Sequence, residues 1–501
     1  MLGQRPSVQS LAEENWDLVV VGGGITGAGV ALEAARRGKK TLLVEQRDYA
    51  WGTSSRSSKM VHGGLRYIAQ GDIKLTRHSL LERERLLQEL PELVVRQTYL
   101  FPIRKGKFPG RWAMKVILWL YDFLAGIRDH RWVPIMEVAR RAPGLNRAGL
   151  KGAMSYTDAL TDDSRLVMRA LHEAASHGAR ACNYMEAAAV TPGADGISVQ
   201  LRDVLNGDEA TVKARCVINA TGAWADRLSG ADAKVRPQRG SHLFIPMERL
   251  PVSDCLTVMH PRDQRPVFVF PWEGRTCIGT TDLDHPDSLN FEPVCTRAEI
   301  DYLLELINSQ FPQANISDAD IISTMAGVRP IIASGKGVDP SKERRDHAVW
   351  GENGVITVSG GKLTTFRLIA LDALLAAGLI DEDERERSET GGKAFSHAVA
   401  APHRLGHPLA PMPEGEALRE QLAWVLDNEM VTRLDDLLLR RTRLGNLLPD
   451  GAAAILEDVR ALCMDKLGWD DARWQDELSR YQDIVQRYYS VAPRQAEASA
   501  A

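Results

Sequence analysis

The sequence predicts an α/β fold (α+β overall) of three parts, and three observations support this prediction. Residues 17–45 read as a strand, a helix and a second strand around a glycine-rich turn. Residues 267–282 read as two short strands joined by a tight turn, which is typical of an antiparallel sheet. Residues 416–489 read as four helices. We therefore expect a parallel-stranded first part, an antiparallel-sheet part and a C-terminal helical part.

The first part begins with a βαβ unit of about 30 residues, the length such a unit needs. Residues 18–21 form a short apolar run, β-branched except for the leucine, that fits a buried parallel strand. Residues 28–37 are rich in alanine and favour a helix. Residues 41–44 form the second strand. The unit therefore predicts a Rossmann-like domain.

The turn of this unit carries the spacing G-x-G-x-x-G, which predicts a dinucleotide site. Gly22 allows the tight turn, Gly24 lets the backbone approach a pyrophosphate, and Gly27 lets the helix pack closely on the strand. Glu45 ends the second strand, where a carboxylate can hold ribose hydroxyls and would disfavour a 2′-phosphate. The motif does not distinguish NAD from FAD, and a glycine-rich turn in an unrelated α/β protein is the alternative.

Composition limits the class of protein. The chain has 501 residues, 44% of them hydrophobic, and a net charge of −4, which allows about two to four domains and gives no reason to expect nucleic acid as a partner. Its six cysteines have no metal-ligand spacing and are expected to be reduced thiols, and no metal site is expected. We see no signal peptide and no transmembrane segment, and expect residues 1–14 to form a mobile tail.

A hydroxyl-rich segment follows the βαβ unit. Residues 53–67 read TSSRSSKMVHGGLRY. Serine runs are usually solvated loops, but these hydroxyls can also surround a phosphate or a flavin edge, and adjacent glycines permit close backbone approach.

This segment, downstream of the βαβ unit, resembles the aerobic, respiratory FAD-dependent glycerol-3-phosphate dehydrogenases, which belong to the D-amino-acid-oxidase-like FAD oxidoreductases. Later segments match the same family in order: RGSH at 239–242, GTTD at 279–282, AGVRP at 326–330 and RRDH at 344–347. The resemblance implies FAD as cofactor and oxidation of sn-glycerol 3-phosphate to dihydroxyacetone phosphate. It also implies a membrane quinone as electron acceptor and a cytoplasmic enzyme held peripherally at the inner face of the membrane.

The resemblance also implies site residues. His242, with Arg329, is expected to take the C2 hydroxyl proton while hydride passes to the flavin, although a single histidine is more often structural. The substrate phosphate and hydroxyls are assigned to Arg66, Tyr67, Arg329, Arg345 and Lys362. The expected cofactor residues are Gly22, Gly24, Gly27, Glu45, Thr53, Ser54, Ser58, Gly63, Gly64, Gly222, Gly361, Lys362, Leu363 and Thr364.

A basic and aromatic segment at residues 99–134 has two interpretations. Its cationic residues precede an apolar helix rich in tryptophan. The helix can pack against the substrate domain or a partner subunit, or it can lie in a membrane interface with its cationic flank at the headgroups.

The expected domains are a discontinuous FAD-binding domain (15–100, 151–236 and 326–380) and a substrate-binding domain (101–150 and 237–325). A linker (381–415) and a C-terminal helical domain (416–490) follow. The first part of that last domain looks shortened against the family, which puts its role in quinone access or dimer contact in doubt and leaves a homodimer open. Rival functions are a glycerol-3-phosphate oxidase using oxygen, an FAD amine oxidase, and a non-catalytic flavin-binding membrane adaptor.

Overall fold

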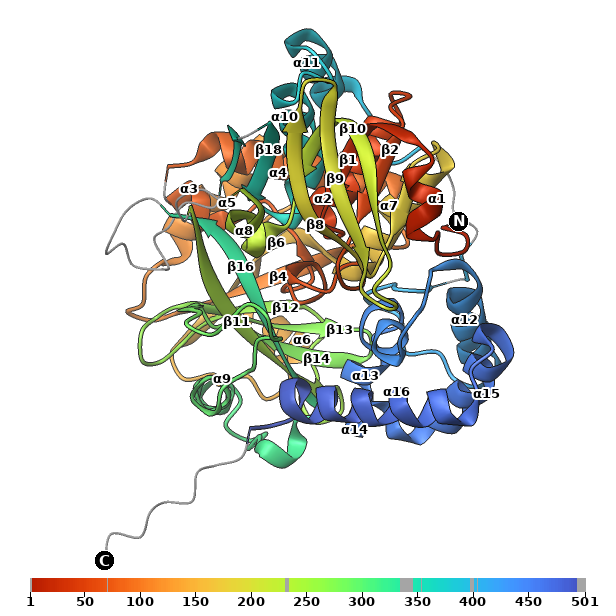
Figure 1. The fold of residues 1–501 in the computed structure, drawn as a ribbon. Coiled ribbons are helices and arrows are strands. Elements are labelled where there is room, and N and C mark those ends of the chain that lie inside the picture. The colour runs from red at the N-terminus through yellow and green to blue at the C-terminus, as the bar shows by residue number, and fades with distance from the viewer. Residues whose placement is uncertain are drawn as a thin grey trace, which may run out of the picture.

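The computed structural model describes residues 2–69, 71–229, 234–333, 346–352, 354–396, 401–402 and 404–492. Two large sheets form the body of the molecule, and a group of C-terminal helices lies beside the second sheet (Figure 1). The predicted fold class is confirmed, because a parallel Rossmann-like sheet and a mainly antiparallel sheet are both present. All six cysteines are buried and free.

The first sheet contains the predicted βαβ unit. Its central strand β1 pairs in parallel with β2 on one side and β10 on the other, so that Val21 lies opposite both Val44 and Asn219. Helices α2 (Ile25–Ala35), α7 (Asp163–Ser176) and α10 (Phe366–Ala376) pack against the sheet and bury an alanine-rich core. The strands in spatial order are β17 (His347–Glu352), β18 (Val355–Gly360), β10 (Glu209–Asn219), β1 (Asn15–Val21), β2 (Thr41–Val44) and β7 (Arg180–Cys182). In addition, β9 (Gly196–Asp203) pairs with β10, and β8 (Met185–Gly193) pairs with β9.

The second sheet has ten strands and is antiparallel except where β12 meets β4. Its strands in order are β15 (Leu283–Asp284), β11 (Val235–Pro246), β14 (Arg275–Gly279), β13 (Pro266–Trp272), β12 (Cys255–Met259), β4 (Val94–Arg104), β6 (Leu150–Thr161) and β3 (Met60–Val61), with β16 (Ser323–Ile332) beside β11 and β5 (Arg131–Val133) beside β6. The expected domain division assigned β3, most of β4 and most of β6 to the FAD-binding part. In the structure these strands pair with one another in the second sheet, the one expected for the substrate-binding part. The domain boundaries themselves stay a prediction.

The helices follow the apolar periodicity of the sequence. They are α1 (Val8–Ala12), α2 (Ile25–Ala35), α3 (Leu65–Ala69), α4 (Ile73–Glu89), α5 (Arg111–Ala125), α6 (Ile135–Arg141), α7 (Asp163–Ser176), α8 (Ala225–Ser229), α9 (Arg297–Gln310), α10 (Phe366–Ala376), α11 (Glu382–Gly391), α12 (Gly415–Asn428), α13 (Leu444–Leu447), α14 (Pro449–Ala452), α15 (Leu456–Leu467) and α16 (Asp471–Ile484). Shorter helical turns are η1 (Thr53–Ser55), η2 (Gly222–Trp224), η3 (Asp318–Asp320), η5 (Leu363–Thr365), η6 (Asp436–Arg441), η7 (Ala453–Ile455) and η8 (Val485–Tyr489). Within the described ranges, no helix is long and apolar enough to cross a membrane.

Two expectations about irregular segments are wrong. The expected N-terminal tail contains α1, whose Val8 and Leu11 are buried against the first sheet. The expected charged linker begins with the ten-residue helix α11, capped by Asp381. Some of its charges pair with the body of the protein, as Glu384 does with Arg37 and Arg385 with Asp372, each at 2.7 Å, whereas Glu382, Asp383, Glu386 and Arg387 are exposed. A run of mixed charges forms a helix when acids fill its first turn and its basic partners lie nearby.

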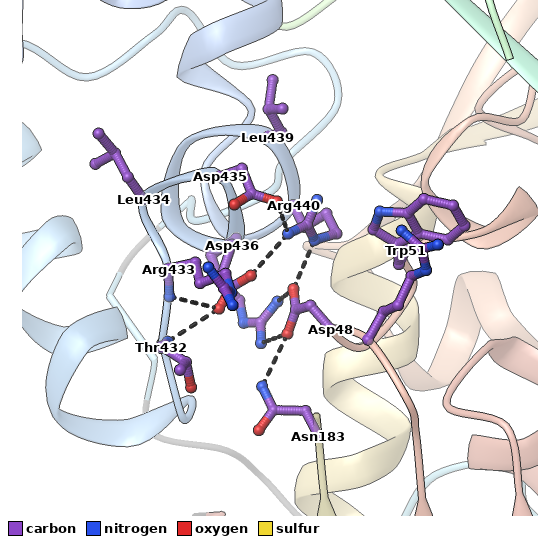
Figure 2. Close-up of polar contacts among 12 residues, drawn as sticks. Asp48, Trp51, Asn183, Thr432, Arg433, Leu434, Asp435, Asp436, Leu439 and Arg440 are labelled. Carbon is purple, nitrogen blue, oxygen red and sulfur yellow. Dashed lines mark hydrogen bonds and ion pairs between the residues drawn. The ribbon is translucent and has the colours of Figure 1, made fainter. Parts of the chain in front are cut away.

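The C-terminal helical region is joined to the first sheet by buried ion pairs. Asp48, just beyond β2, accepts hydrogen bonds from Arg440 at 2.6 Å and from Arg441 at 2.7 Å (Figure 2). Arg440 also binds Asp435 and Asp436 in and beside η6. Because all these side chains are buried, the pairs fix how the helical region meets the segment that follows Glu45.

Candidate functional site

A cavity of about 400 Å³ lies at the carboxyl ends of β1, β2, β10 and β18. This is the edge of a parallel sheet where ligands bind in open α/β folds. The described residues that line it are Val21, Gly22, Gly24, Ile25, Thr26, Glu45, Gln46, Trp51, Gly52, Thr53, Ser54, Ser57, Glu186, Ala187, Ala188, Ala220, Thr221, Gly222, Trp224, Arg227, Leu228, Pro330, Gly360, Gly361, Lys362 and Leu363.

The glycines of the turn have the close contacts that the motif predicts. Gly22 has a φ of +114°, and a Cβ there would lie 2.6 Å from the carbonyl oxygen of Ala220. A Cβ on Gly27 would lie 1.9 Å from the carbonyl oxygen of Gly22. Gly24 precedes α2, so the N-terminus of this helix faces the cavity with its N–H groups and partial positive charge.

Glu45 both lines the cavity and braces the turn. Its carboxylate accepts the N–H of Gly23 at 2.7 Å and the N–H of Arg47 at 2.8 Å. Burial raises the pKa of Glu45, although these two backbone hydrogen bonds act in the opposite direction. The expected ribose-binding acid is therefore held in a fixed orientation at the cavity wall.

The hydroxyl-rich segment connects the cavity to the second sheet. Ser54 accepts the N–H of Ile25 at 3.0 Å, and Thr53 donates to the carbonyl of Val328 on β16. Ser58 lies 3.0 Å from Nε2 of His242 on β11. These contacts exclude the alternative of a freely solvated loop.

His242 of β11 is buried, with Ser58 and Gly279 of β14 beside its ring. A Cβ on Gly279 would lie 2.1 Å from the imidazole Cδ2, so only glycine leaves room for the ring. Burial lowers the pKa of His242 to about 3, and the positive charges of Arg329 and Lys59 add to this effect. Among the described residues, Nδ1 of His242 has no hydrogen-bond partner. The imidazole is therefore neutral near pH 7.

Arg329 comes from β16, the strand that pairs with β11, and lies opposite Gln238. Its guanidinium donates to the hydroxyl of Thr280 at 2.9 Å and contacts the carboxylate of Asp282 at 3.4 Å. A Cβ on Gly240 would lie 2.2 Å from the same guanidinium, so the backbone of β11 allows Arg329 to lie close. The RGSH, GTTD and AGVRP segments thus meet around one cation.

Lys362 and Tyr67 lie together, as expected for residues of one subsite. The Lys362 ammonium lies 3.8 Å from the centre of the Tyr67 ring and donates to Ser79 at 2.8 Å. Lys362 also lines the cavity. Arg66 belongs to α3, but its side chain lies outside the described part of the structure, as does the whole of Arg345.

Five expected cofactor residues are not part of the described cavity lining: Gly27, Ser58, Gly63, Gly64 and Thr364. Gly27 packs the helix, Ser58 contacts His242, and Thr364 hydrogen-bonds the backbone of His62. The Gly63 N–H donates to Tyr121 at 2.9 Å, and a Cβ on Gly64 would clash with Tyr67. A direct contact of these five residues with the cofactor therefore stays a prediction.

Sequence reasoning missed two aromatic residues of the cavity. Trp51 and Trp224 lie with ring centres 5.8 Å apart, and Arg47 lies over Trp51 at 4.0 Å. They come from segments about 170 residues apart that meet only in the fold. Only their sequence position could have indicated them: Trp51 lies two residues before Thr53, and Trp224 lies two residues after Gly222, both predicted cofactor residues.

The comparison with known families decides the assignment. A model described as FAD dependent oxidoreductase matches residues 17–367, and one described as the C-terminal domain of alpha-glycerophosphate oxidase matches residues 391–474. The chain belongs to the FAD-dependent oxidoreductase family. The resemblance inferred from the sequence motifs is thereby confirmed.

Individual proteins similar to this FAD-dependent oxidoreductase support the same family assignment. The chain is 38% identical over 387 residues to the aerobic glycerol-3-phosphate dehydrogenase of Staphylococcus epidermidis, covering 75% of this chain and 69% of that protein. It is 37% identical over 375 residues to the Staphylococcus aureus enzyme of the same name, covering 73% and 67%. The glycerol-3-phosphate dehydrogenase of Bacillus halodurans, solved with FAD, has a TM-score of 0.71 at 25% identity and covers 98% of both chains.

The residues present fit FAD. The turn leaves no space for a side chain at Gly22, whereas a Cβ on Gly222 would meet no atom within 4 Å. The helix N-terminus suits a pyrophosphate, and Glu45 suits the ribose hydroxyls of a cofactor without a 2′-phosphate. FAD is the cofactor of this oxidoreductase.

Proposed function

We propose that this enzyme oxidises sn-glycerol 3-phosphate to dihydroxyacetone phosphate and passes the electrons to a quinone at the inner face of the cytoplasmic membrane. The Staphylococcus relatives bear the name of this activity and are 37–38% identical to the chain. The observation that carries the proposal is that two groups from neighbouring strands converge on one short segment. The neutral, buried His242 of β11 packs on Gly279, and the guanidinium of Arg329 on β16 binds the adjacent Thr280.

The substrate's phosphate is a dianion and needs fixed cations. A guanidinium donates two hydrogen bonds at once and stays charged, so Arg329 suits a phosphate or a hydroxyl that loses its proton. Lys362 and Tyr67 supply an ammonium and a phenol beside the cavity. We assign Arg66 and Arg345 to the same substrate-binding set from their family motifs.

His242 is suited to accept the proton of the substrate's C2 hydroxyl. Its neutral imidazole has Nε2 within hydrogen-bond reach of Ser58, and a bound hydroxyl could replace that contact. Arg329 stabilises negative charge that develops on the C2 oxygen. FAD, when bound, supplies the acceptor for the hydride from C2. The protein's part is to fix C2, the base and the cation in one geometry.

A second candidate is glycerol-3-phosphate oxidation with oxygen as the acceptor. The match of residues 391–474 to the C-terminal domain of alpha-glycerophosphate oxidase favours it. The two candidates share the substrate half of the reaction and differ only in how the reduced cofactor is reoxidised.

The test is turnover of the purified holoenzyme with sn-glycerol 3-phosphate, with dihydroxyacetone phosphate and peroxide both quantified. We expect product formation to depend on an added quinone analogue with little peroxide, whereas peroxide equal to product would identify the oxidase. Arg329→Met should raise KM about tenfold to hundredfold, the worth of a charge-assisted hydrogen bond. Arg215→Met is the matched control, because the Arg215 side chain is 85% exposed. Unchanged kinetics in Arg329→Met would contradict the proposed role.

A further inference from the structure

Helix α5 carries an apolar stripe on its outer surface. The stripe consists of Trp112, Val116, Trp119 and Phe123, residues that are 74%, 65%, 59% and 69% exposed. Phe108, just before the helix, is 84% exposed. The Trp119 and Phe123 rings stack at 5.9 Å. Contiguous exposed groups of this size mark a surface that binds something apolar.

The opposite side of α5 already anchors the helix to the protein. Met114, Leu118, Tyr121 and Ala125 are buried in the core that lies under the second sheet. The spacing of 112, 116, 119 and 123 puts all four stripe residues on one helix face, away from that core. The interpretation of α5 as a packing helix is therefore confirmed for its inner face. It leaves the exposed outer face without a role.

Positive charge surrounds the stripe. Arg104, Lys105, Lys107, Arg111 and Lys115 lie along residues 101–121, a stretch without a single aspartate or glutamate. The Lys115 ammonium lies 5.4 Å from the Trp112 ring centre, so cation and apolar surface are adjacent. The first acid, Asp122, is buried and held by His130 at 2.7 Å. The outer surface of this segment therefore presents cations beside aromatic rings.

We infer that α5 lies in the interface of an anionic lipid bilayer, with its apolar stripe among the acyl chains and its basic residues at the headgroups. Aromatic rings flanked by lysine and arginine are the composition of interfacial helices. A second copy of this chain fits less well, because a two-fold contact through the stripe would bring five like charges on each side together. Anionic headgroups neutralise the same charges.

The inner face of α5 touches the candidate site. The Tyr121 hydroxyl accepts the Gly63 N–H at 2.9 Å and donates to Asp158 at 2.7 Å. Helix α3, which holds Tyr67, lies beside α5 on the side of the molecule away from α12, α15 and α16 (Figure 1). Lipid binding through α5 therefore sets the substrate-binding segment against the membrane. This inference deepens the quinone part of the proposed function by naming the surface that meets the lipid.

The test is flotation of the FAD-loaded protein with vesicles of phosphatidylcholine alone or with phosphatidylglycerol added. We expect binding that needs the anionic lipid and weakens with salt. The double variant Trp119→Ser, Phe123→Ser should lower the partition coefficient more than about tenfold. Lys105→Gln and Lys107→Gln together should lower it by about fivefold per lysine. Phe291→Ser is the matched control, because Phe291 is 64% exposed on another surface and should leave binding unchanged.

Failure of this inference is distinguishable from failure of the proposed function, because reduction of the bound flavin by sn-glycerol 3-phosphate is measured on the same samples without lipid. Equal vesicle binding by the wild type and the Trp119→Ser, Phe123→Ser variant would overturn the inference. So would a wild-type protein that floats with neither vesicle, or a variant whose only change is loss of a dimer in light scattering.

Discussion

The guanidinium of Arg441 binds both carboxylate oxygens of Asp48, each at 2.7 Å, across 393 positions of the chain. Asp48 also accepts from Arg440 at 2.6 Å and from the Asn183 amide at 3.1 Å (Figure 2). Asp48 lies three residues after Glu45 and three before Trp51, both of which line the cavity. Ion pairs with the C-terminal helical region thus fix the position of residues 45–51, which include the cavity-lining Glu45 and Trp51.

Asp48→Asn should destabilise the protein by about 3–5 kcal/mol, because the change removes the bidentate carboxylate partner of the buried Arg441 and one of the three carboxylate partners of the buried Arg440. The measurement is the urea concentration at the unfolding midpoint of the FAD-loaded protein. Asp483→Asn is the control, since its pair with Arg487 is exposed and should be worth less than about 1 kcal/mol. A midpoint for Asp48→Asn equal to that of the control would contradict the structural role of Asp48.

Stability should fall in acid through Glu429. Burial opposes ionisation of Glu429, but the ion pair with Arg165 at 2.6 Å and the hydrogen bond from His172 lower its pKa from 4.5 to about 2. The folded carboxylate binds its proton less readily than the unfolded one, so its contribution of about 3 kcal/mol is present above pH 4.5 and lost as pH falls toward 2.

The checking measurement compares Glu429→Gln with wild type in urea unfolding between pH 7 and pH 3. The stability difference should be full at pH 7 and shrink to about half near pH 3.5. A difference that is independent of pH would show that the carboxylate charge is not what stabilises this site.

His242 should act as a neutral base across the accessible pH range. Because its pKa is about 3, the acid limb of a kcat/KM profile should not show a group near 6.5. His242→Asn should lower kcat about 10²–10⁴-fold with FAD still bound. Arg329→Met removes one of the charges that depress the His242 pKa, so any acid limb should move to higher pH. An acid limb at 6.5 that is abolished in His242→Asn would contradict a neutral buried imidazole.

Gly27→Ala should abolish FAD binding, because its Cβ would lie 1.9 Å from the carbonyl oxygen of Gly22 and force α2 away from the turn. Gly110→Ala is the control, since a Cβ there meets no atom within 4 Å and its φ of −77° suits alanine. The measurement is the FAD content of the purified proteins. Equal FAD content in both variants would contradict the close packing of helix and strand.

Local signals predicted much of this fold. The βαβ unit at residues 17–45, with its strand at residues 41–44, follows from short-range rules of spacing and propensity and is confirmed. The helix at α11 was not predicted, because Glu384 in its first turn finds its partner, Arg37, 347 positions away in the sequence. Ion pairs between distant segments, such as Asp48 with Arg441, leave no local pattern to read.

The same limit applies to the site. The glycines and Glu45 belong to one contiguous motif and were predictable from it. Trp51 follows β2 in the chain, and Trp224 follows β10. The two side chains meet because β2 and β10 both pair with β1, so their carboxyl ends lie close together. Which of Arg66, Arg329 and Arg345 contacts the phosphate depends on tertiary geometry that spacing does not encode.

The most direct test is an anaerobic titration of the FAD-loaded protein with sn-glycerol 3-phosphate, followed by the visible absorbance of the flavin. The account predicts that the absorbance bleaches rapidly and returns when a quinone analogue is added. Bound flavin that sn-glycerol 3-phosphate leaves oxidised, or that glycine or sarcosine bleaches instead, would contradict it.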